Sequence, residues 1–247
     1  MYKHKTIISS KAMPTVTNYL HILFDLDHTL WDFDRCATET LTDLYHKHQL
    51  KQLGASSPTE LCRAFHQVNR RLWDLYNRGE YDSERLRRER FSLIFDELQL
   101  TYNSTLPQVF AKEYLATCPT KGHVIAEAAA TLDKLRGRYR LHIITNGFSD
   151  VQAIKLQYAG LADYFQTVTS SDVAGYRKPN AGMFHYALEN ISATPSECIM
   201  IGDNLKTDVL GARNAGIDQV YFNPARHEHT DEVTYEINAL PELLAIL

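Results

Sequence analysis

The stretch that decides the fold is F-D-L-D-H-T-L, residues 24–30, in which two acids follow an apolar run. That run, L-x-I-L-F at residues 20–24, is nearly continuous in large apolar side chains. Such a run is typical of a strand that is buried on both faces of a parallel sheet. Asp25 and Asp27 thus stand where a buried strand ends, and carboxylates add nothing to the packing of a core. Their position predicts a chemical role.

Apolar runs later in the chain predict more strands, and helical patterns lie between them. The predicted strands are Leu20–Asp27, Arg140–Asn146, Gln166–Asp172, Cys198–Asp203 and Gln219–Phe222. The predicted helices around the later strands are His123–Arg136, Asp150–Tyr158 and Ala181–Leu188. Alternating strands and helices predict an α/β fold, a Rossmann-like parallel sheet with right-handed crossovers.

The long interval between the first two strands has a helical pattern. Ser57-Pro58-Thr59-Glu60 combines a capping serine, a proline at the first helical position and a glutamate three residues after the cap. The apolar residues that follow have the helical period, and they are Leu61, Phe65, Val68, Leu72 and Tyr76. Gly79 is expected to end this helix, and the next is expected to begin at Asp82 or Ser83.

This pattern predicts two parts of the chain. Residues 34–118 are expected to form an all-helical cap that is inserted after the first strand. Residues 1–33 and 119–247 are expected to form the α/β core, with the first eighteen as a frayed tail. The insertion leaves the order of strands and helices in the core intact.

Composition excludes several classes of protein. The 247 residues carry a net charge of −4, and 44% are hydrophobic, as in soluble globular domains. No basic stretch predicts binding to a nucleic-acid polymer, and no apolar stretch is long enough for a membrane span or a signal peptide. The four cysteines are far apart, which favours a reducing compartment. We therefore expect a cytoplasmic protein.

Polar residues gather at the predicted carboxyl ends of the strands, where open parallel sheets bind their ligands. These residues are Asp25, Asp27, Thr145, Asn146, Lys178, Asp203 and Asp208. Several carboxylates in one cleft repel each other, and a hard cation such as Mg²⁺ relieves that repulsion. The lysine and the Thr-Asn turn suit an anion. The set predicts a site for phosphoryl transfer.

Four motifs in this set resemble those of the haloacid dehalogenase superfamily. In chain order they are D-x-D-x-T-L, I-I-T-N, K-P and G-D-N-x-x-x-D, and they lie between about residues 20 and 222. A single D-x-D motif is common by chance, whereas four motifs in this order are specific. The resemblance implies a Rossmann-like core, a helical cap and hydrolase chemistry.

The resemblance also implies a role for each acid. Asp25 would attack the phosphorus of a phosphomonoester and form an aspartyl-phosphate. Asp27 would act as general acid and base. Mg²⁺ would be held by the Asp25 carboxylate, the Asp27 backbone carbonyl and Asp203, and Asp208 would orient Lys178 or a metal-bound water.

The remaining residues of the motifs would handle the phosphate. Thr145 and the backbone N–H of Asn146 would hold the phosphoryl oxygens, and Lys178 would screen the charge where Asp25 meets the phosphate. His28, in the variable position of the first motif, is expected to be a turn residue.

Two features bear on the substrate. The second acid, Asp27, favours phosphatase chemistry, because the true haloacid dehalogenases do without it. The segment L-W-D-L-Y-N-R-G-E (residues 72–80), with T-N-G-F (145–148), is similar to the pyrimidine 5′-nucleotidase subgroup. The resemblance implies a nucleoside 5′-monophosphate as substrate. A phosphatase or mutase that acts on sugar phosphates or other small phosphorylated metabolites remains an alternative.

Four aromatic residues near the predicted cleft could flank a base, since stacking tolerates different bases. They are Trp31, Phe33, Trp73 and Tyr76. For Trp73 and Tyr76, packing within the cap is the favoured alternative, because both lie near the apolar stripe of their predicted helix.

Overall fold

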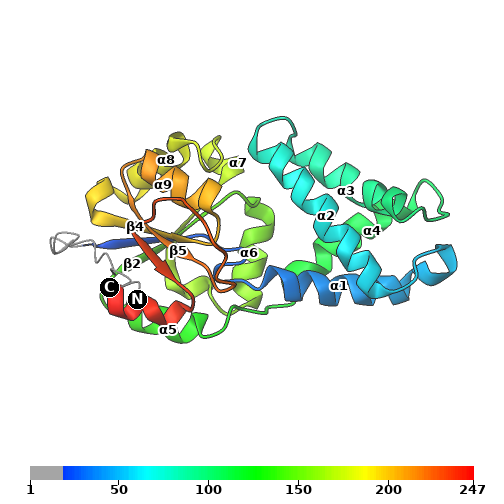
Figure 1. The fold of residues 1–247 in the computed structure, drawn as a ribbon, viewed down its shortest axis with the longest axis horizontal. Helices are drawn as coiled ribbons and strands as arrows, with labels where there is room; N and C mark the ends of the chain where they lie inside the picture. Colours follow the sequence, from blue (N-terminus) through cyan, green and yellow to red (C-terminus); the bar gives the residue numbers. More distant parts are fainter. Residues whose placement is uncertain (1–18) are drawn as a thin grey trace, which may run out of the picture.

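The fold is built on a six-stranded sheet in which every pair of neighbouring strands is parallel. A computed structural model describes residues 19–247, so the predicted frayed tail lies outside the described residues. The strand order is β3-β2-β1-β4-β5-β6. The strands are β1 (His21–Phe24), β2 (Arg140–Thr145), β3 (Phe165–Ser170), β4 (Cys198–Gly202), β5 (Asp218–Phe222) and β6 (Tyr235–Ile237). The predicted parallel α/β sheet is confirmed (Figure 1).

Helices cover both faces of the sheet, with α8 and α9 on one side and α5 on the other (Figure 1). The helices of this part are α5 (Ala128–Leu135), α6 (Ser149–Tyr158), α7 (Ser171–Ala174), α8 (Ala181–Ile191), α9 (Leu210–Asn214) and α10 (Leu243–Ile246). Side chains of β1 alternate between the two faces, as the period of a strand requires. Ile22 and Phe24 pack on one side, and Leu23 packs on the other with Met200 and Phe184.

One helix prediction was wrong at its start, and one strand was not predicted. The helix expected from His123 begins only at Ala128, because residues 123–125 pair with the loop after β1 instead. The Ile125 N–H donates to the Leu30 carbonyl (2.9 Å), and Glu127 has a left-handed φ of 61° that a continuous helix does not allow. Strand β6 was missed, since its three residues form no apolar run.

The first four α-helices follow β1 and precede α5, and they pack together at one end of the molecule (Figure 1). They are α1 (Phe33–Lys47), α2 (Pro58–Asn77), α3 (Ser83–Glu97) and α4 (Leu106–Thr117). The Ser57 hydroxyl caps α2 by accepting the Glu60 N–H (3.2 Å), and the apolar stripe of α2 is fully buried. We call α1–α4 the helical insertion. The exact division of the chain at residues 33/34 and 118/119 stays a prediction.

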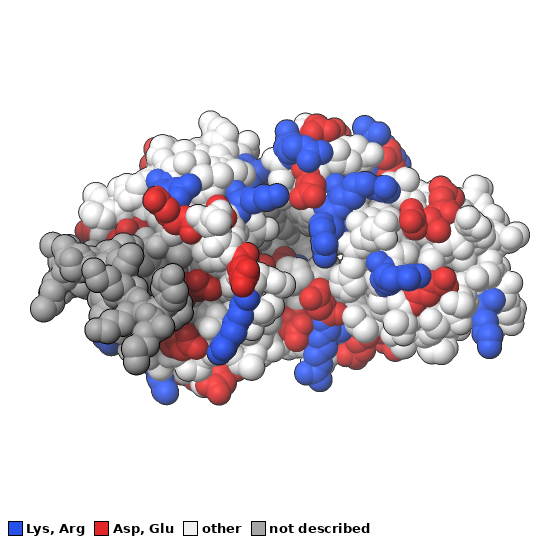
Figure 2. Space-filling model, in the orientation of Figure 1, with Lys and Arg blue, Asp and Glu red and all other residues white. Residues whose placement is uncertain are grey.

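Residues 19–247 contain no disulfide and no helix suited to cross a membrane. All four cysteines are buried and unbridged. Within this range no helix combines the length and the apolar character that a membrane crossing needs. On the visible face Lys and Arg are interspersed with Asp and Glu (Figure 2).

A buried histidine pair joins β1 and β2 and predicts sensitivity of the fold to acid. His21 Nδ1 lies 3.0 Å from His142 Nε2, and burial lowers the pKa of His142 to about 4. Between about pH 6.5 and pH 4 the unfolded chain therefore binds a proton that the folded chain does not. The free energy of unfolding therefore decreases as the pH falls through that window. We expect the free energy of unfolding in urea to be about 1–2 kcal/mol lower at pH 5 than at pH 7 from this residue.

The variant His142→Gln, which cannot titrate, serves as the comparison. It should lose less stability than the wild type between pH 7 and pH 5 in the same urea experiment. Equal losses in the two proteins would show that the histidine pair does not limit stability in acid.

Candidate active site

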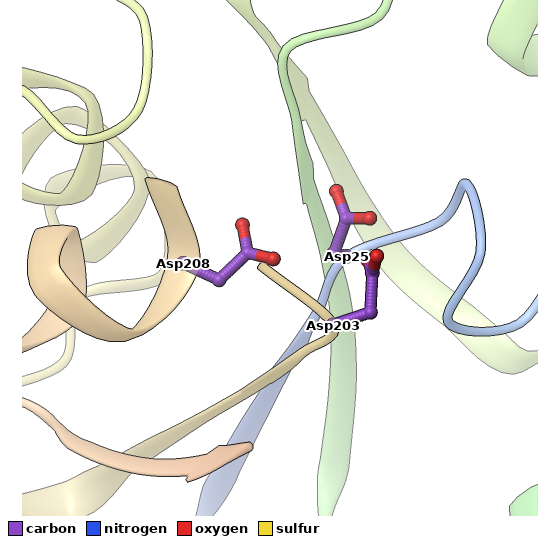
Figure 3. Close-up of side chains that lie close together, drawn as sticks. All are labelled: Asp25, Asp203 and Asp208. Atoms are coloured by element: carbon purple, nitrogen blue, oxygen red, sulfur yellow. The ribbon is translucent and has the colours of Figure 1, made fainter. Parts of the chain in front are cut away.

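Three acids from different parts of the chain meet at the carboxyl end of the sheet (Figure 3). Asp25 follows β1, Asp203 follows β4, and Asp208 lies in a π-helix at Leu205–Val209. Each offers a carboxylate oxygen, and these oxygens all lie within 4.8 Å of one another. We call this set the acidic cluster. The structure thus brings together three of the predicted site residues.

The residues around the acidic cluster hold it in place. A side chain at Gly202 would bring its Cβ to 2.3 Å from the Asp208 carboxylate, so only glycine lets Asp208 approach β4. The Asn204 N–H donates to Asp208 (3.1 Å), and the Thr29 hydroxyl donates to Asp203 (3.2 Å). These contacts orient the carboxylates before any ligand binds.

Lys178 lies against the acidic cluster and is 2% exposed. Its ammonium donates to Asp25 (2.5 Å) and to the Ile144 carbonyl (2.8 Å), and it lies 2.7 Å from Asp208. Burial opposes the charged form, but the two carboxylates raise the pKa of Lys178 above its usual value. Since an ammonium has three donors and each has an acceptor here, the side chain is fixed in one direction.

The acidic cluster still lacks positive charge, because one ammonium faces three carboxylates. Burial raises the pKa of Asp25 to about 8, with Asp208 and Asp203 adding to the effect of burial against the attraction of Lys178. Burial and Asp208 also raise the pKa of Asp203 to about 7. Closely spaced carboxylate oxygens with a deficit of positive charge are the donor set that suits Mg²⁺. The residues present therefore fit this ion.

Asp27 contacts two side chains of α6. It accepts from the Lys155 ammonium (2.5 Å) and from the Gln152 amide (3.1 Å). Burial opposes its charged form, but these two groups together lower the pKa of Asp27. The Lys155 ammonium also lies 4.4 Å from the centre of the Trp31 ring, which fixes its position.

Lys155 and Gln152 were missed in the sequence. They lie three residues apart on the helix that follows the second strand, so they share one face of it. The helix begins close to the predicted site residues Thr145 and Asn146. A polar face on such a helix is a signal that could have identified Gln152 and Lys155 in the sequence.

Thr145 ends β2 with its hydroxyl oxygen already engaged. It accepts from the Gly147 N–H (3.0 Å) and from Gln152 (3.0 Å). The hydroxyl hydrogen is left to donate to a ligand in the cavity. Gly147 is required here, because a Cβ would lie 1.7 Å from the Gln152 amide nitrogen.

The Asn146 side chain links three segments. Its amide donates to Asn77 of α2 (2.9 Å) and to the Lys178 carbonyl (2.9 Å), and its oxygen accepts the Lys178 N–H (2.7 Å). The side chain thus fixes the segment that carries Lys178. The predicted contact of the Asn146 backbone N–H with phosphate stays a prediction.

A cavity of about 1130 Å³ opens above the acidic cluster, between the sheet and the helical insertion. The visible face is hollowed where these two parts meet (Figure 2). Asp25, Asp27 and Lys178 lie on the sheet side. The size suits a ligand of the dimensions of a nucleotide.

Of the aromatic residues predicted to flank a base, some line the cavity and one packs against neighbouring helices. Trp73 lines the cavity and also stacks on Phe148, with ring centres 5.6 Å apart. Tyr76 does not line the cavity; it is 3% exposed and its hydroxyl is 2.8 Å from Ser171 Oγ. Of the two alternatives for Tyr76, the structure supports packing, because its ring lies against Trp73 and Phe148. Trp31 and Phe33 do line the cavity.

The chain is similar to known hydrolases over nearly its whole length. A family model described as haloacid dehalogenase-like hydrolase matches residues 19–216. The pyrimidine 5′-nucleotidase PynA of Streptococcus pneumoniae is 32% identical, over 93% of this chain and 95% of its own. The pyrimidine 5′-nucleotidase YjjG of Escherichia coli is 31% identical, over 92% and 96%.

A solved structure agrees with these relatives. The putative hydrolase YfnB of Bacillus subtilis, solved with bound magnesium, superposes with a TM-score of 0.82 at 27% identity, over 93% of this chain and 98% of its own. The predicted superfamily is confirmed: the chain belongs to the haloacid dehalogenase-like hydrolases.

Proposed function

We propose that the protein is a magnesium-dependent phosphomonoesterase that hydrolyses nucleoside 5′-monophosphates through a phosphorylated Asp25. The observation that carries this proposal is the acidic cluster beside Lys178 at the floor of a nucleotide-sized cavity. The pyrimidine 5′-nucleotidases among the relatives support the choice of substrate.

In the first step a carboxylate oxygen of Asp25 attacks phosphorus, and the bond from phosphorus to the nucleoside oxygen breaks. Lys178 donates to Asp25 and contacts Asp208, and it thereby keeps the Asp25 carboxylate in line with the phosphorus. The Thr145 hydroxyl donates to a phosphoryl oxygen. Asp27 gives its proton to the departing oxygen, since an arriving phosphate dianion favours its protonated form.

In the second step water attacks the phosphorus of the aspartyl-phosphate. Asp27 takes a proton from that water, the bond from phosphorus to the Asp25 oxygen breaks, and inorganic phosphate leaves. The contacts of Asp27 with Lys155 and Gln152 favour the carboxylate form that accepts this proton. Asp25 is regenerated as a carboxylate.

Asp25 and Asp203 would hold Mg²⁺, with the Asp27 carbonyl as a third ligand. When bound, the ion would neutralise charge on the carboxylates and on the phosphoryl oxygens. Asp208 lies 2.7 Å from Lys178, and we assign it the task of positioning that ammonium.

A release assay for inorganic phosphate tests the proposal. The panel holds UMP, CMP, dTMP, AMP and several hexose phosphates, each with MgCl₂ and with EDTA. We expect release from nucleotides in MgCl₂ and a loss of release in EDTA. Preference for hexose phosphates would favour the sugar-phosphate alternative, and phosphate that moves on the sugar without release would favour a mutase.

An ion pair that holds the helical insertion over the cavity gives a prediction. Arg87 of α3 donates twice to Asp150 of α6 (2.8 and 2.7 Å), and its guanidinium lies 4.4 Å from the centre of the Phe148 ring. Arg87→Met should weaken the contact between the helical insertion and α6. We expect KM for UMP to rise by about two- to tenfold, because a partly exposed ion pair contributes little free energy, and kcat to change less.

The matched control for this variant is Arg88→Met. Arg88 lies on the same helix, but its ion pairs are with Glu84 and Glu89 of α3 itself. Its KM should stay near the wild-type value. Equal KM values in the two variants would remove the role of Arg87 in closure.

A further inference from the structure

Two polar side chains of the helical insertion are buried in the cavity wall without a hydrogen bond or an ion pair among the described residues. Asn69 of α2 is 7% exposed, and Arg90 of α3 is 6% exposed. Both line the cavity. Asn69 Oδ1 and Arg90 Nε have no hydrogen-bond partner, and within residues 19–247 neither side chain has a hydrogen bond or an ion pair. Neighbouring Arg85, Arg87 and Arg88 are all paired with carboxylates.

This arrangement costs stability. A buried charge without a counter-charge is among the most destabilising features a fold can contain. Burial also lowers the pKa of the Arg90 guanidinium, with no carboxylate to oppose that effect. Packing gives no reason for an arginine here, because an apolar side chain of similar size would fill the space at lower cost. A ligand that accepts hydrogen bonds from the Arg90 guanidinium would explain why an arginine is buried here.

The position of Arg90 relative to the acids indicates which part of a ligand it would meet. Its guanidinium lies 6.0 Å from the centre of the Tyr114 ring. Tyr114 and Arg90 line the same cavity as Asp27. Asp27 serves the oxygen of the leaving group. Arg90, farther into the helical insertion, would meet the distal end of that group.

The cavity walls indicate the shape of that distal end. Aromatic side chains line the same cavity as Asn69 and Arg90: Phe33 and Trp73 are half-buried, and Trp31, Tyr114 and Phe148 are buried. Aromatic walls favour a flat ring, because ring faces stack well on one another. A second phosphate would meet apolar faces there. A planar base with a polar edge fits both the walls and the unpartnered groups.

We propose that Arg90 and Asn69 read the edge of a pyrimidine base, with Arg90 donating to the O2 carbonyl and Asn69 pairing with position 3 and position 4. This inference rests on the proposed function. Uracil and thymine offer a donor at N3 and an acceptor at O4, and cytosine offers the reverse. A carboxamide carries one acceptor and one donor group, so rotation of the Asn69 amide matches either pattern. Adenine has no carbonyl for Arg90.

The test compares substrates that share a phosphate and a ribose but differ in the base. For Arg90→Met, kcat/KM for UMP should fall about 10²-fold, since a buried hydrogen-bonding group is then left unpaired. Its kcat/KM for ribose 5-phosphate should change by less than about threefold. Asn69→Leu should show the same pattern with a fall of about tenfold. Arg88→Met is the matched control on the same helix.

Thermal unfolding without ligand separates a binding role from a structural one. Arg90→Met removes an unpaired buried charge, so its midpoint should equal or exceed that of the wild type. An arginine that supports the fold would lower the midpoint when it is replaced. A lower midpoint together with equal losses on UMP and ribose 5-phosphate would overturn the inference.

Two more results decide the matter. A loss in Arg90→Met that is confined to sugar bisphosphates, with UMP unaffected, would mean that the group binds a second anion, and the inference would be wrong. A wild-type enzyme that hydrolyses ribose 5-phosphate but no nucleotide would refute the proposed function itself, and the inference with it. Loss on UMP alone supports both.

Discussion

Replacing Asp25 with asparagine is expected to reduce phosphate release from UMP at least about 10⁴-fold, as removal of a nucleophile does. Asparagine has nearly the same shape, but its amide does not attack phosphorus. The rate is measured as inorganic phosphate released at saturating UMP in MgCl₂. Release above about a tenth of the wild-type rate would show that another group attacks.

The fold should survive this change. Burial raises the pKa of the Asp25 carboxyl to about 8, so the charged form is costly there, and a neutral side chain relieves that cost. We expect a thermal midpoint close to the wild-type value. The control is Asp32→Asn at the N-cap of α1, where the side chain accepts the Arg35 N–H (3.0 Å). Since asparagine also caps helices well, this control should keep both stability and activity.

Replacing Lys178 with methionine is expected to affect both stability and catalysis. Its ammonium is the positive charge that lies between Asp25 and Asp208. Without it the buried carboxylates have no counter-charge, and the free energy of unfolding in EDTA should fall by about 3–5 kcal/mol. Phosphate release should fall by about 10²–10³-fold, because the group that orients Asp25 is gone. Urea unfolding and the phosphate assay measure the two effects.

A lysine that also pairs with two carboxylates, but with exposed ones, provides the control. Lys121 contacts Glu39 (2.9 Å) and Asp43 (2.6 Å), and both acids are well exposed. Lys121→Met should cost at most about 1 kcal/mol, since exposed ion pairs contribute little. MgCl₂ should restore part of the stability of Lys178→Met and leave Lys121→Met unchanged. Equal losses in the two variants would mean that the acidic cluster does not depend on Lys178.

The parts of the site that the sequence predicted are those that topology brings together. Asp25, Asp203 and Lys178 are remote in the chain, but each follows a strand. The carboxyl ends of parallel strands meet at one edge of the sheet, so recognition of the strands was enough to place these residues near one another. The helical stripe of α2 was predictable for a similar reason, because burial on one face repeats with the helical period.

The parts that were missed depend on contacts between elements. Lys155 and Gln152 reach Asp27 only because α6 packs against the loop after β1. The Asn146 side chain bonds to Asn77 and Lys178, which no local pattern indicates. Tyr76 has the spacing of a core residue and the chemistry of a ligand contact, and only the packing of α2 on Ser171 decides between them.

Capture of the phosphoryl group on Asp25 tests the central claim most directly. Asp27→Asn should lack the base for the second step, whereas p-nitrophenyl phosphate has a leaving group that departs without an acid. The variant should therefore accumulate phosphorylated enzyme, and mass spectrometry of acid-quenched peptides should place one phosphoryl group on Asp25. Absence of that adduct while p-nitrophenol forms in a burst, or an adduct on another residue, would contradict the account.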